Sequence, residues 1–161
     1  TARTQVGAGT RVLVRDIVSA PGIPDLHALS ARICETVTFT LGASEPSWSA
    51  EDAISAGKGV CQDHTHIFIA CARAMGLPAR YVSGYLMLNE STVQEAMHAW
   101  AEAYVDGLGW VGFDVSNGIS PDTRYVRVAT GLDYSDAAPI SGTRIGGSGE
   151  VLDVRINVVQ Q

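Results

Sequence analysis

The chain has 161 residues, of which 46% are hydrophobic, and this size and composition suit one compact domain, residues 1–161, that needs no staple to fold. Acidic residues outnumber basic ones by 17 to 11, and the formal net charge of -6 argues against a nucleic-acid or anionic-membrane surface. No apolar run approaches the roughly 20 residues of a membrane span, so we expect no membrane segment. Three cysteines are too few for a secreted disulfide framework, which makes a cytoplasmic location the default expectation. The first residue is Thr1 and not Met, so an upstream domain is a further expectation.

Two helices are expected before residue 40. Apolar residues between Thr10 and Val18 fit a helix face or a strand, and we favour the helix. Between Pro24 and Phe39 the apolar residues recur at spacings of three and four, which predicts a helix. They are Leu26, Leu29, Ile33 and Val37.

A short helix and then a long, buried one are expected next. Ser49-Ala50-Glu51-Asp52 resembles a capping box, and Gly57 or Gly59 would end the helix that it begins. The following helix runs from Cys61 to Met75, where Gly76 supplies a left-handed cap and Pro78 prevents continuation. Its interior is apolar nearly all round, so we expect it to be the central helix of the domain.

Antiparallel strands are expected in the second half of the chain. They span residues 80–88, 98–105 and 110–115, and the last two are joined by Asp106-Gly107-Leu108-Gly109, which has the residues of a tight hairpin. Helices followed by antiparallel strands give an α+β domain. Residues 120–139 are expected to be a lid or a surface loop, and Gly146-Gly147-Ser148-Gly149 to set off a last strand.

A cysteine at the start of the predicted central helix is followed by a histidine and an aspartate on predicted strands. The three residues are Cys61, His98 and Asp114, in the chain order of a Cys-His-Asp nucleophilic triad. Helix-start amides and the helix dipole favour negative charge, so a thiol there is expected to be a good nucleophile at neutral pH. His98 is the expected proton acceptor, and Asp114 is expected to orient its imidazole.

The orientation of His98 raises a difficulty. Alternation along strand 98–105 puts His98 and Trp100 on one face and three alanines on the other. Because the alanines leave room for the cysteine helix, a regular pleat points His98 away from that helix. A position at the strand end, or a β-bulge, would resolve the conflict.

These motifs together resemble the transglutaminase-like superfamily, in its bacterial branch with a papain-like site. The resemblance runs from about Phe39 to Asn117, within a domain core of about residues 24–135. It rests on Gly59-Val60-Cys61-Gln62-Asp63, Gly76-Leu77-Pro78-Ala79-Arg80-Tyr81-Val82-Ser83-Gly84-Tyr85, His98-Ala99-Trp100 and Gly109-Trp110-Val111-Gly112-Phe113-Asp114. The sequence departs from the branch at His64, usually aromatic or small there, and at Val115-Ser116, usually Pro-Thr.

The resemblance implies a Cys61-His98-Asp114 triad that forms a thioester on Cys61 and needs no cofactor. Capture by water would make the protein a cysteine peptidase or amidase acting on a peptide or protein, and capture by an amine would make it a transglutaminase. The chain has no visible calcium-loop pattern, which argues against calcium-dependent cross-linking. We therefore favour hydrolysis of peptide, isopeptide or amide bonds, with amine transfer second.

Six neighbouring residues are weaker candidates for substrate-binding or supporting roles. Gln62 suits an oxyanion hole or an exposed helical position, and the backbone amide of Cys61 is the better oxyanion donor. Asp63 suits the dipole of the first helical turn more than substrate contact. His64, when protonated, would raise the proportion of thiolate. The others are aromatic residues that line a cleft or belong to the core: Trp48, Tyr85 and Trp100.

Two hypotheses from other functional classes remain open. Cys61, His64 and His66 form a C-x-x-H-x-H cluster with zinc-type ligands, but a helix rotates His66 away from the face shared by the other two. We therefore expect no metal. A noncatalytic binding module that keeps the fold is the second alternative, because the altered residues lie beside the proposed triad.

Overall fold

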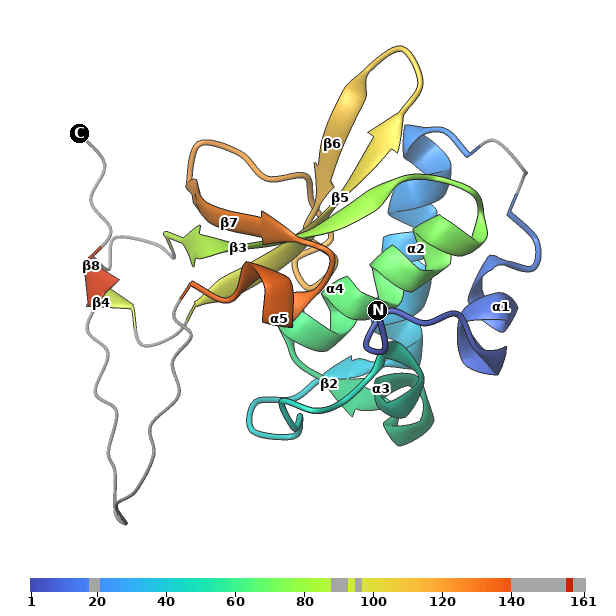
Figure 1. Cartoon of the computed structure of the whole chain (residues 1–161), viewed down its shortest axis with the longest axis horizontal. Coiled ribbons are helices and arrows are strands. Elements are labelled where there is room, and N and C mark those ends of the chain that lie inside the picture. The colour runs from blue at the N-terminus through green and yellow to red at the C-terminus, as the bar shows by residue number, and fades with distance from the viewer. Residues whose placement is uncertain (18–20, 88–92, 95–96, 140–155, 158–161) are drawn as a thin grey trace.

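A four-stranded antiparallel sheet packs against a central helix, and three further helices gather around that helix (Figure 1). This arrangement comes from a computed structural model, in which the structure describes residues 1–17, 21–87, 93–94, 97–139 and 156–157. The elements are α1 (Ala8–Val14), α2 (Ile23–Thr36), β1 (Thr38–Phe39), α3 (Ala50–Ala56), β2 (Lys58–Gly59), α4 (Cys61–Ala74), β3 (Ala79–Leu86), β4 (Val93–Gln94), β5 (His98–Val105), β6 (Gly109–Phe113), β7 (Tyr125–Gly131), α5 (Tyr134–Ala137) and β8 (Ile156–Asn157). The predicted α+β class is confirmed.

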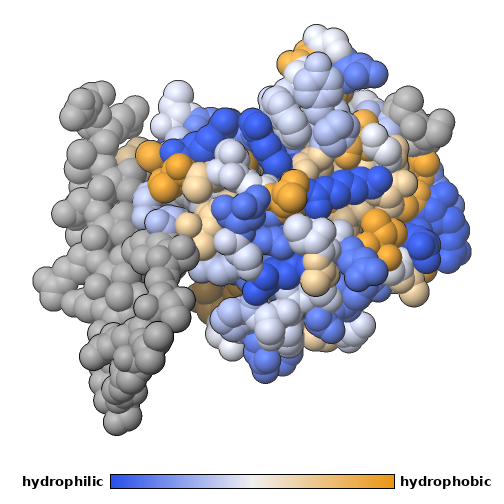
Figure 2. All heavy atoms as spheres, in the orientation of Figure 1, coloured by the Kyte–Doolittle hydropathy of each residue, from blue (hydrophilic) through white to orange (hydrophobic). Residues whose placement is uncertain are grey.

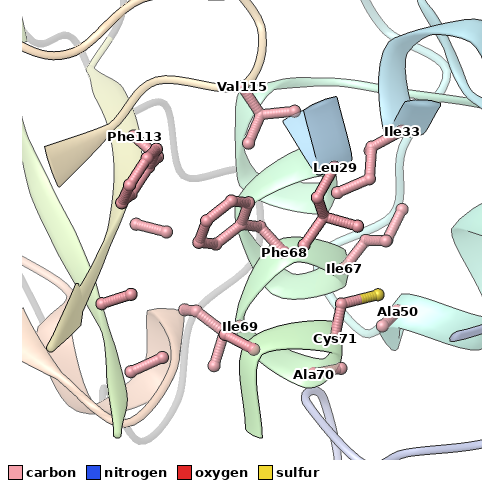
Figure 3. Close-up of a cluster of buried hydrophobic side chains, with 14 of the residues drawn as sticks. Leu29, Ile33, Ala50, Ile67, Phe68, Ile69, Ala70, Cys71, Phe113 and Val115 are labelled. Carbon is pink, nitrogen blue, oxygen red and sulfur yellow. The ribbon is translucent and has the colours of Figure 1, made fainter. Parts of the chain in front are cut away.

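Helix α4 is the buried centre of the domain, as its apolar sequence predicts. Ile67, Phe68 and Ile69 are fully buried, and Figure 3 shows them between α2 on one side and the sheet on the other. The Phe68 ring stacks on Phe113 of β6, with ring centroids 5.0 Å apart. Full burial of one such side chain contributes roughly 1.5–3 kcal/mol, so this layer holds α4 firmly against the sheet.

The ends of α3 and α4 follow the predicted capping signals. The Ser49 backbone N–H donates to Asp52 Oδ2 at 2.8 Å, and Ser49 Oγ accepts from the Asp52 N–H at 3.3 Å. Gly57 ends α3 with a left-handed φ of 65°, and Gly76 follows α4 with a φ of 83°. Both φ values lie where residues other than glycine are strained.

The first two predicted helices need correction at their ends. Residues 8–14 are helical, as favoured, but the helix is shorter than predicted, and Val18 lies outside the described residues. Helix α2 ends at Thr36, and Phe39 belongs to a strand. The Thr38 backbone N–H donates to Gly57 O at 3.0 Å, which draws the chain into a parallel pair of two-residue strands, β1 and β2.

The main sheet has the order β6-β5-β3-β7, with all neighbours antiparallel. The hairpin between β5 and β6 is confirmed, and Gly107 and Gly109 adopt left-handed φ values in it. Strand β6 begins and ends earlier than predicted, and Val115 lies beyond it. Leu88, at the predicted end of the first strand, and Gly146-Gly147-Ser148-Gly149 lie outside the described residues.

The region 120–139 is not simply a surface loop, because it contains a strand and a short helix. Its residues 125–131 form β7, which pairs with β3 and closes one edge of the sheet, and α5 follows. Val126 and Val128 alternate with Arg127, as in a strand, but both valines are exposed and do not mark a buried face.

The surface mixes polar and apolar residues. On the face shown in Figure 2, apolar residues are scattered among hydrophilic ones and do not form one broad patch. Within the described parts of the chain, no helix combines the length and the apolarity needed to traverse a bilayer.

Candidate active site

Cys61 is the first residue of α4 and is half-buried. The preceding residue, Val60, is extended, and its backbone N–H donates to Asp63 Oδ2 at 2.8 Å, which fixes the start of the helix. A side chain on Gly59 would place its Cβ 2.8 Å from the Asp63 Cβ, so this approach needs a glycine. The first backbone N–H groups of a helix have no intrahelical acceptor, and they surround the thiol with partial positive charge.

His98 reaches Cys61 from the end of a strand. It is the first residue of β5, and the fully or nearly buried alanines at 99, 101 and 103 alternate with it, in the strand that packs on α4. The Cys61 side chain is among the groups that raise the pKa of His98, which places the imidazole beside the thiol. Of the two explanations offered for the orientation of His98, the strand-end position is therefore the one that the structure supports.

Asp114 follows β6 directly and accepts three hydrogen bonds at Oδ2. His98 Nε2 lies 2.6 Å from this oxygen, Asn117 Nδ2 donates at 2.7 Å, and the Tyr125 hydroxyl donates at 2.7 Å. Because Nε2 of His98 faces Asp114, Nδ1 is the nitrogen left for the thiol. The structure thus brings Cys61, His98 and Asp114 together in the order that the sequence predicts.

Asp114 and His98 shift each other's pKa. Burial lowers the pKa of His98, but the hydrogen bonds and charges of Asp114 and Cys61 outweigh burial and raise the pKa to about 9. Burial raises the pKa of Asp114, but the hydrogen bond and charge of His98, with the hydrogen bonds from Asn117 and Tyr125, bring it below its ordinary value. At neutral pH the pair is therefore an imidazolium and a carboxylate.

Sequence reasoning missed two residues that hold Asp114, namely Asn117 and Tyr125. The Asn117 backbone N–H also donates to Asp114 Oδ1 at 3.2 Å, and the Asn-Gly pair that begins there is a recognisable turn signal. Tyr125 lies on β7, and its ring contacts those of His98 and Trp100, with centroids 6.0 Å and 5.4 Å away. No local signal marks Tyr125, because only strand pairing brings it to the site.

The Tyr125 hydroxyl is expected to contribute to reactivity at Cys61. Tyr125→Phe keeps the ring and removes one hydrogen bond to the carboxylate. We expect alkylation of Cys61 by iodoacetamide at neutral pH to slow by up to about tenfold, because hydrogen bonds to charged groups contribute roughly 1.5–3 kcal/mol and Asp114 keeps other donors. Tyr104→Phe, on the exposed end of β5, is the matched control. Equal rates for the two variants would contradict a role for this hydroxyl.

His64 does not act on the thiol as predicted. Its side chain is buried, with Nε2 2.8 Å from Val37 O and Nδ1 2.9 Å from Ser116 Oγ. Burial lowers the pKa of His64 against the opposing effects of the Val37 carbonyl and of the charges of Asp63 and Asp114. The ring is therefore neutral near pH 7, and both of its nitrogens are occupied. His64 and Ser116, two departures from the family pattern, contact each other.

The other predicted neighbours have mainly structural surroundings. Asp63 is buried and caps α4 through its bond to Val60, in agreement with the dipole reading. Gln62 is half-buried beside the nucleophile. Trp48 packs against the hydrophobic core, Tyr85 is half-buried on β3, and Trp100 is buried with its ring against that of His98.

The Cys61, His64 and His66 side chains do not converge on one point. His66 Nε2 accepts from the Tyr134 backbone N–H at 3.2 Å, and its ring packs on Tyr81. Burial lowers the pKa of His66 to about 4. Over the described residues there is no group of three or more His, Cys, Asp or Glu side chains arranged to hold a metal ion.

Comparison with known proteins places the chain in a family. The model of the transglutaminase-like superfamily matches residues 14–115, a range that includes all three residues of the site. The chain belongs to this superfamily. The core of helices and sheet is thus the core of a transglutaminase-like domain.

Relatives and solved structures agree with this membership. An uncharacterized protein of Mycobacterium tuberculosis is 35% identical over 150 residues, which are 86% of this chain and 48% of the relative. The structure of a candidate cysteine protease from Cytophaga hutchinsonii is 31% identical with a TM-score of 0.72, over 86% of this chain and 46% of that one. A structure named a TGase, 15% identical with a TM-score of 0.54 over 71% of this chain and 32% of that one, shares the fold. The chain thus spans about half the length, or less, of these proteins.

Proposed function

We propose that this transglutaminase-like domain is a cysteine-dependent acyl-transfer enzyme that works through a thioester on Cys61. The observation that carries the proposal is the 2.6 Å distance between His98 Nε2 and Asp114 Oδ2, in an imidazole that also interacts with the Cys61 side chain at the start of α4. A nucleophile, a base and a residue that orients the base are the parts that covalent catalysis requires.

The residues suit the following sequence of steps. The Cys61 thiolate attacks an amide carbonyl carbon, a C–S bond forms, and negative charge develops on the carbonyl oxygen. The His98 imidazolium then donates its proton to the amide nitrogen, the C–N bond breaks, and the amine leaves. Neutral His98 next takes a proton from water, which attacks the thioester carbon. The C–S bond breaks, a carboxylic acid leaves, and the thiolate and imidazolium are restored.

The backbone N–H of Cys61 is the proposed oxyanion donor. It belongs to the first turn of a 14-residue helix, where backbone N–H groups have no helical acceptor. Donors of this kind stabilise charge most when they are already oriented before the reaction. Gln62, half-buried at the next position, remains a proposed supporting residue.

Peptide or protein amides are the proposed substrates, with water as the preferred acceptor. The Cytophaga hutchinsonii structure, which is named for a candidate cysteine protease, is 31% identical to this chain and favours hydrolysis. The rings of Trp100 and Tyr125, which contact His98, also line a surface cavity of about 250 Å³. The chemistry needs a free thiol, so we also propose a reducing compartment, the cytoplasm.

The test is mass spectrometry of Cys61 after incubation of the protein with a library of peptides that carry amide, isopeptide and glutamine groups. We expect a transient acyl adduct on Cys61, located by peptide mapping, and release of a carboxylic acid product. Cys61→Ser is expected to abolish both. Added primary amine separates the acceptors, because amide product in place of acid identifies amine transfer.

Two results would overturn the proposal. The first is turnover that persists in Cys61→Ser. The second is ligand binding that survives Cys61→Ser with no turnover in the wild type, which would identify a noncatalytic binding module.

A further inference from the structure

The loop that carries Asp114 is irregular and needs support from outside itself. We call residues 114–119 the aspartate turn. Backbone bonds close it, because the Asp114 N–H donates to Ile119 O at 2.8 Å and the Ile119 N–H donates to Asp114 O at 3.2 Å. Gly118 adopts a left-handed φ of 66° within it. These bonds define the shape of the turn but not its distance from α4, which carries the nucleophile.

His64 links the aspartate turn to α4. The Val37 carbonyl can only accept, so Nε2 of His64 carries the hydrogen and donates across 2.8 Å. In the neutral ring Nδ1 then accepts from the Ser116 hydroxyl across 2.9 Å. Val37 lies at the end of α2, where carbonyl groups lack helical partners, so one buried side chain joins α2, α4 and the turn.

The contacts close a ring around the proposed site. Cys61 and His64 are three residues apart on α4, so they share one helical face. His64 bonds to Ser116, Ser116 is two residues from Asp114, and Asp114 bonds to His98. His98 completes the ring because its imidazole interacts with the Cys61 side chain. The link between His64 and Ser116 is therefore one of the contacts that hold the aspartate turn beside α4, together with the buried Val115 side chain and the 2.9 Å bond from Cys34 Sγ to Val115 O.

We propose that His64 is a positioning residue, which through Ser116 sets the geometry of the His98-Asp114 pair relative to Cys61. The proposal rests on the proposed function. A role in stability alone would require only that the two polar groups be paired inside the protein. A positioning role makes the further requirement that the pair be intact for Cys61 to react normally.

Four variants separate the two roles. Ser116→Ala removes the hydroxyl. His64→Gln places an amide nitrogen near the position of Nε2 and keeps the bond to Val37, but not the one to Ser116. His64→Asn keeps the bond to Ser116 but not the one to Val37, because the asparagine amide lies near the position of Nδ1. Ser30→Ala is the matched control, since this buried serine donates to Leu26 O at 3.1 Å within α2.

The measurement is the rate of Cys61 alkylation by iodoacetamide as a function of pH, with melting temperatures recorded in parallel. We expect Ser116→Ala and His64→Gln to react about tenfold more slowly at neutral pH, with the reactivity moved to higher pH. His64→Asn is expected to react more like the wild type. Ser30→Ala is expected to leave the pH profile unchanged, because the Ser30 hydroxyl bonds within α2.

The outcomes distinguish the two proposals. Suppose that His98→Ala slows the alkylation of Cys61, but Ser116→Ala and His64→Gln keep the wild-type pH profile. Only the positioning role is then overturned. Equal slowing in His64→Asn and His64→Gln would also overturn it, because the bond to Ser116 would then not matter. If His98→Ala is alkylated as fast as the wild type, the proposed function fails and the positioning role fails with it.

Discussion

His98→Ala is expected to slow the alkylation of Cys61 by iodoacetamide at neutral pH by about a hundredfold or more, the size of effect typical of a general acid–base residue. The wild-type imidazole interacts with the Cys61 side chain and carries positive charge at neutral pH, because its pKa is raised to about 9. Alanine removes both the proton acceptor and the charge that stabilises a thiolate.

A second histidine provides the control for His98→Ala. His27→Ala removes an imidazole that packs edge-on against Phe113, with ring centroids 5.2 Å apart. We expect this variant to be alkylated at the wild-type rate. Peptide mapping must locate the label on Cys61, because Cys34 is also half-buried. A His98→Ala rate equal to that of wild type would show that the thiol does not depend on this imidazole.

Asp114→Asn is expected to lower acyl-transfer activity by about a hundredfold, because the imidazole loses the charge that orients and stabilises its protonated form. The pKa of His98 is expected to fall from about 9 towards its ordinary value of 6.5. The shift is directly measurable by NMR titration of the His98 ring protons, assigned by their loss in His98→Ala. An unchanged His98 titration would contradict the assigned role of Asp114.

The same substitution is expected to change the pH dependence of stability. The folded-state pKa of His98 lies above the unfolded value, so its contribution to stability is complete below about pH 6.5 and is lost as pH rises to about 9. The free energy of unfolding of wild type should therefore fall across this window, and that fall should be smaller in Asp114→Asn. Urea unfolding at several pH values within the window measures both slopes. Parallel slopes for the two proteins would contradict the coupling.

Local sequence signals account for the helical half of the fold. Ser49 and Asp52 cap α3, Gly57 ends it and Gly76 follows α4, because capping and left-handed turns depend on residues only a few positions apart. The β5–β6 hairpin was readable for the same reason. Strands β1 and β2 escaped prediction because two residues are too short to show a period.

The order of Cys61, His98 and Asp114, and the start of α4 at the cysteine, were determined by the sequence itself, since they rest on short motifs and helix-start chemistry. Only the tertiary structure decided which groups surround them. Tyr125 reaches Asp114 because β7 pairs with β3, and His64 binds Ser116 because α4 packs beside the aspartate turn. Helical periodicity identifies the face on which His64 lies, but its hydrogen-bond partners come from segments distant in the chain, and those depend on how the whole core packs.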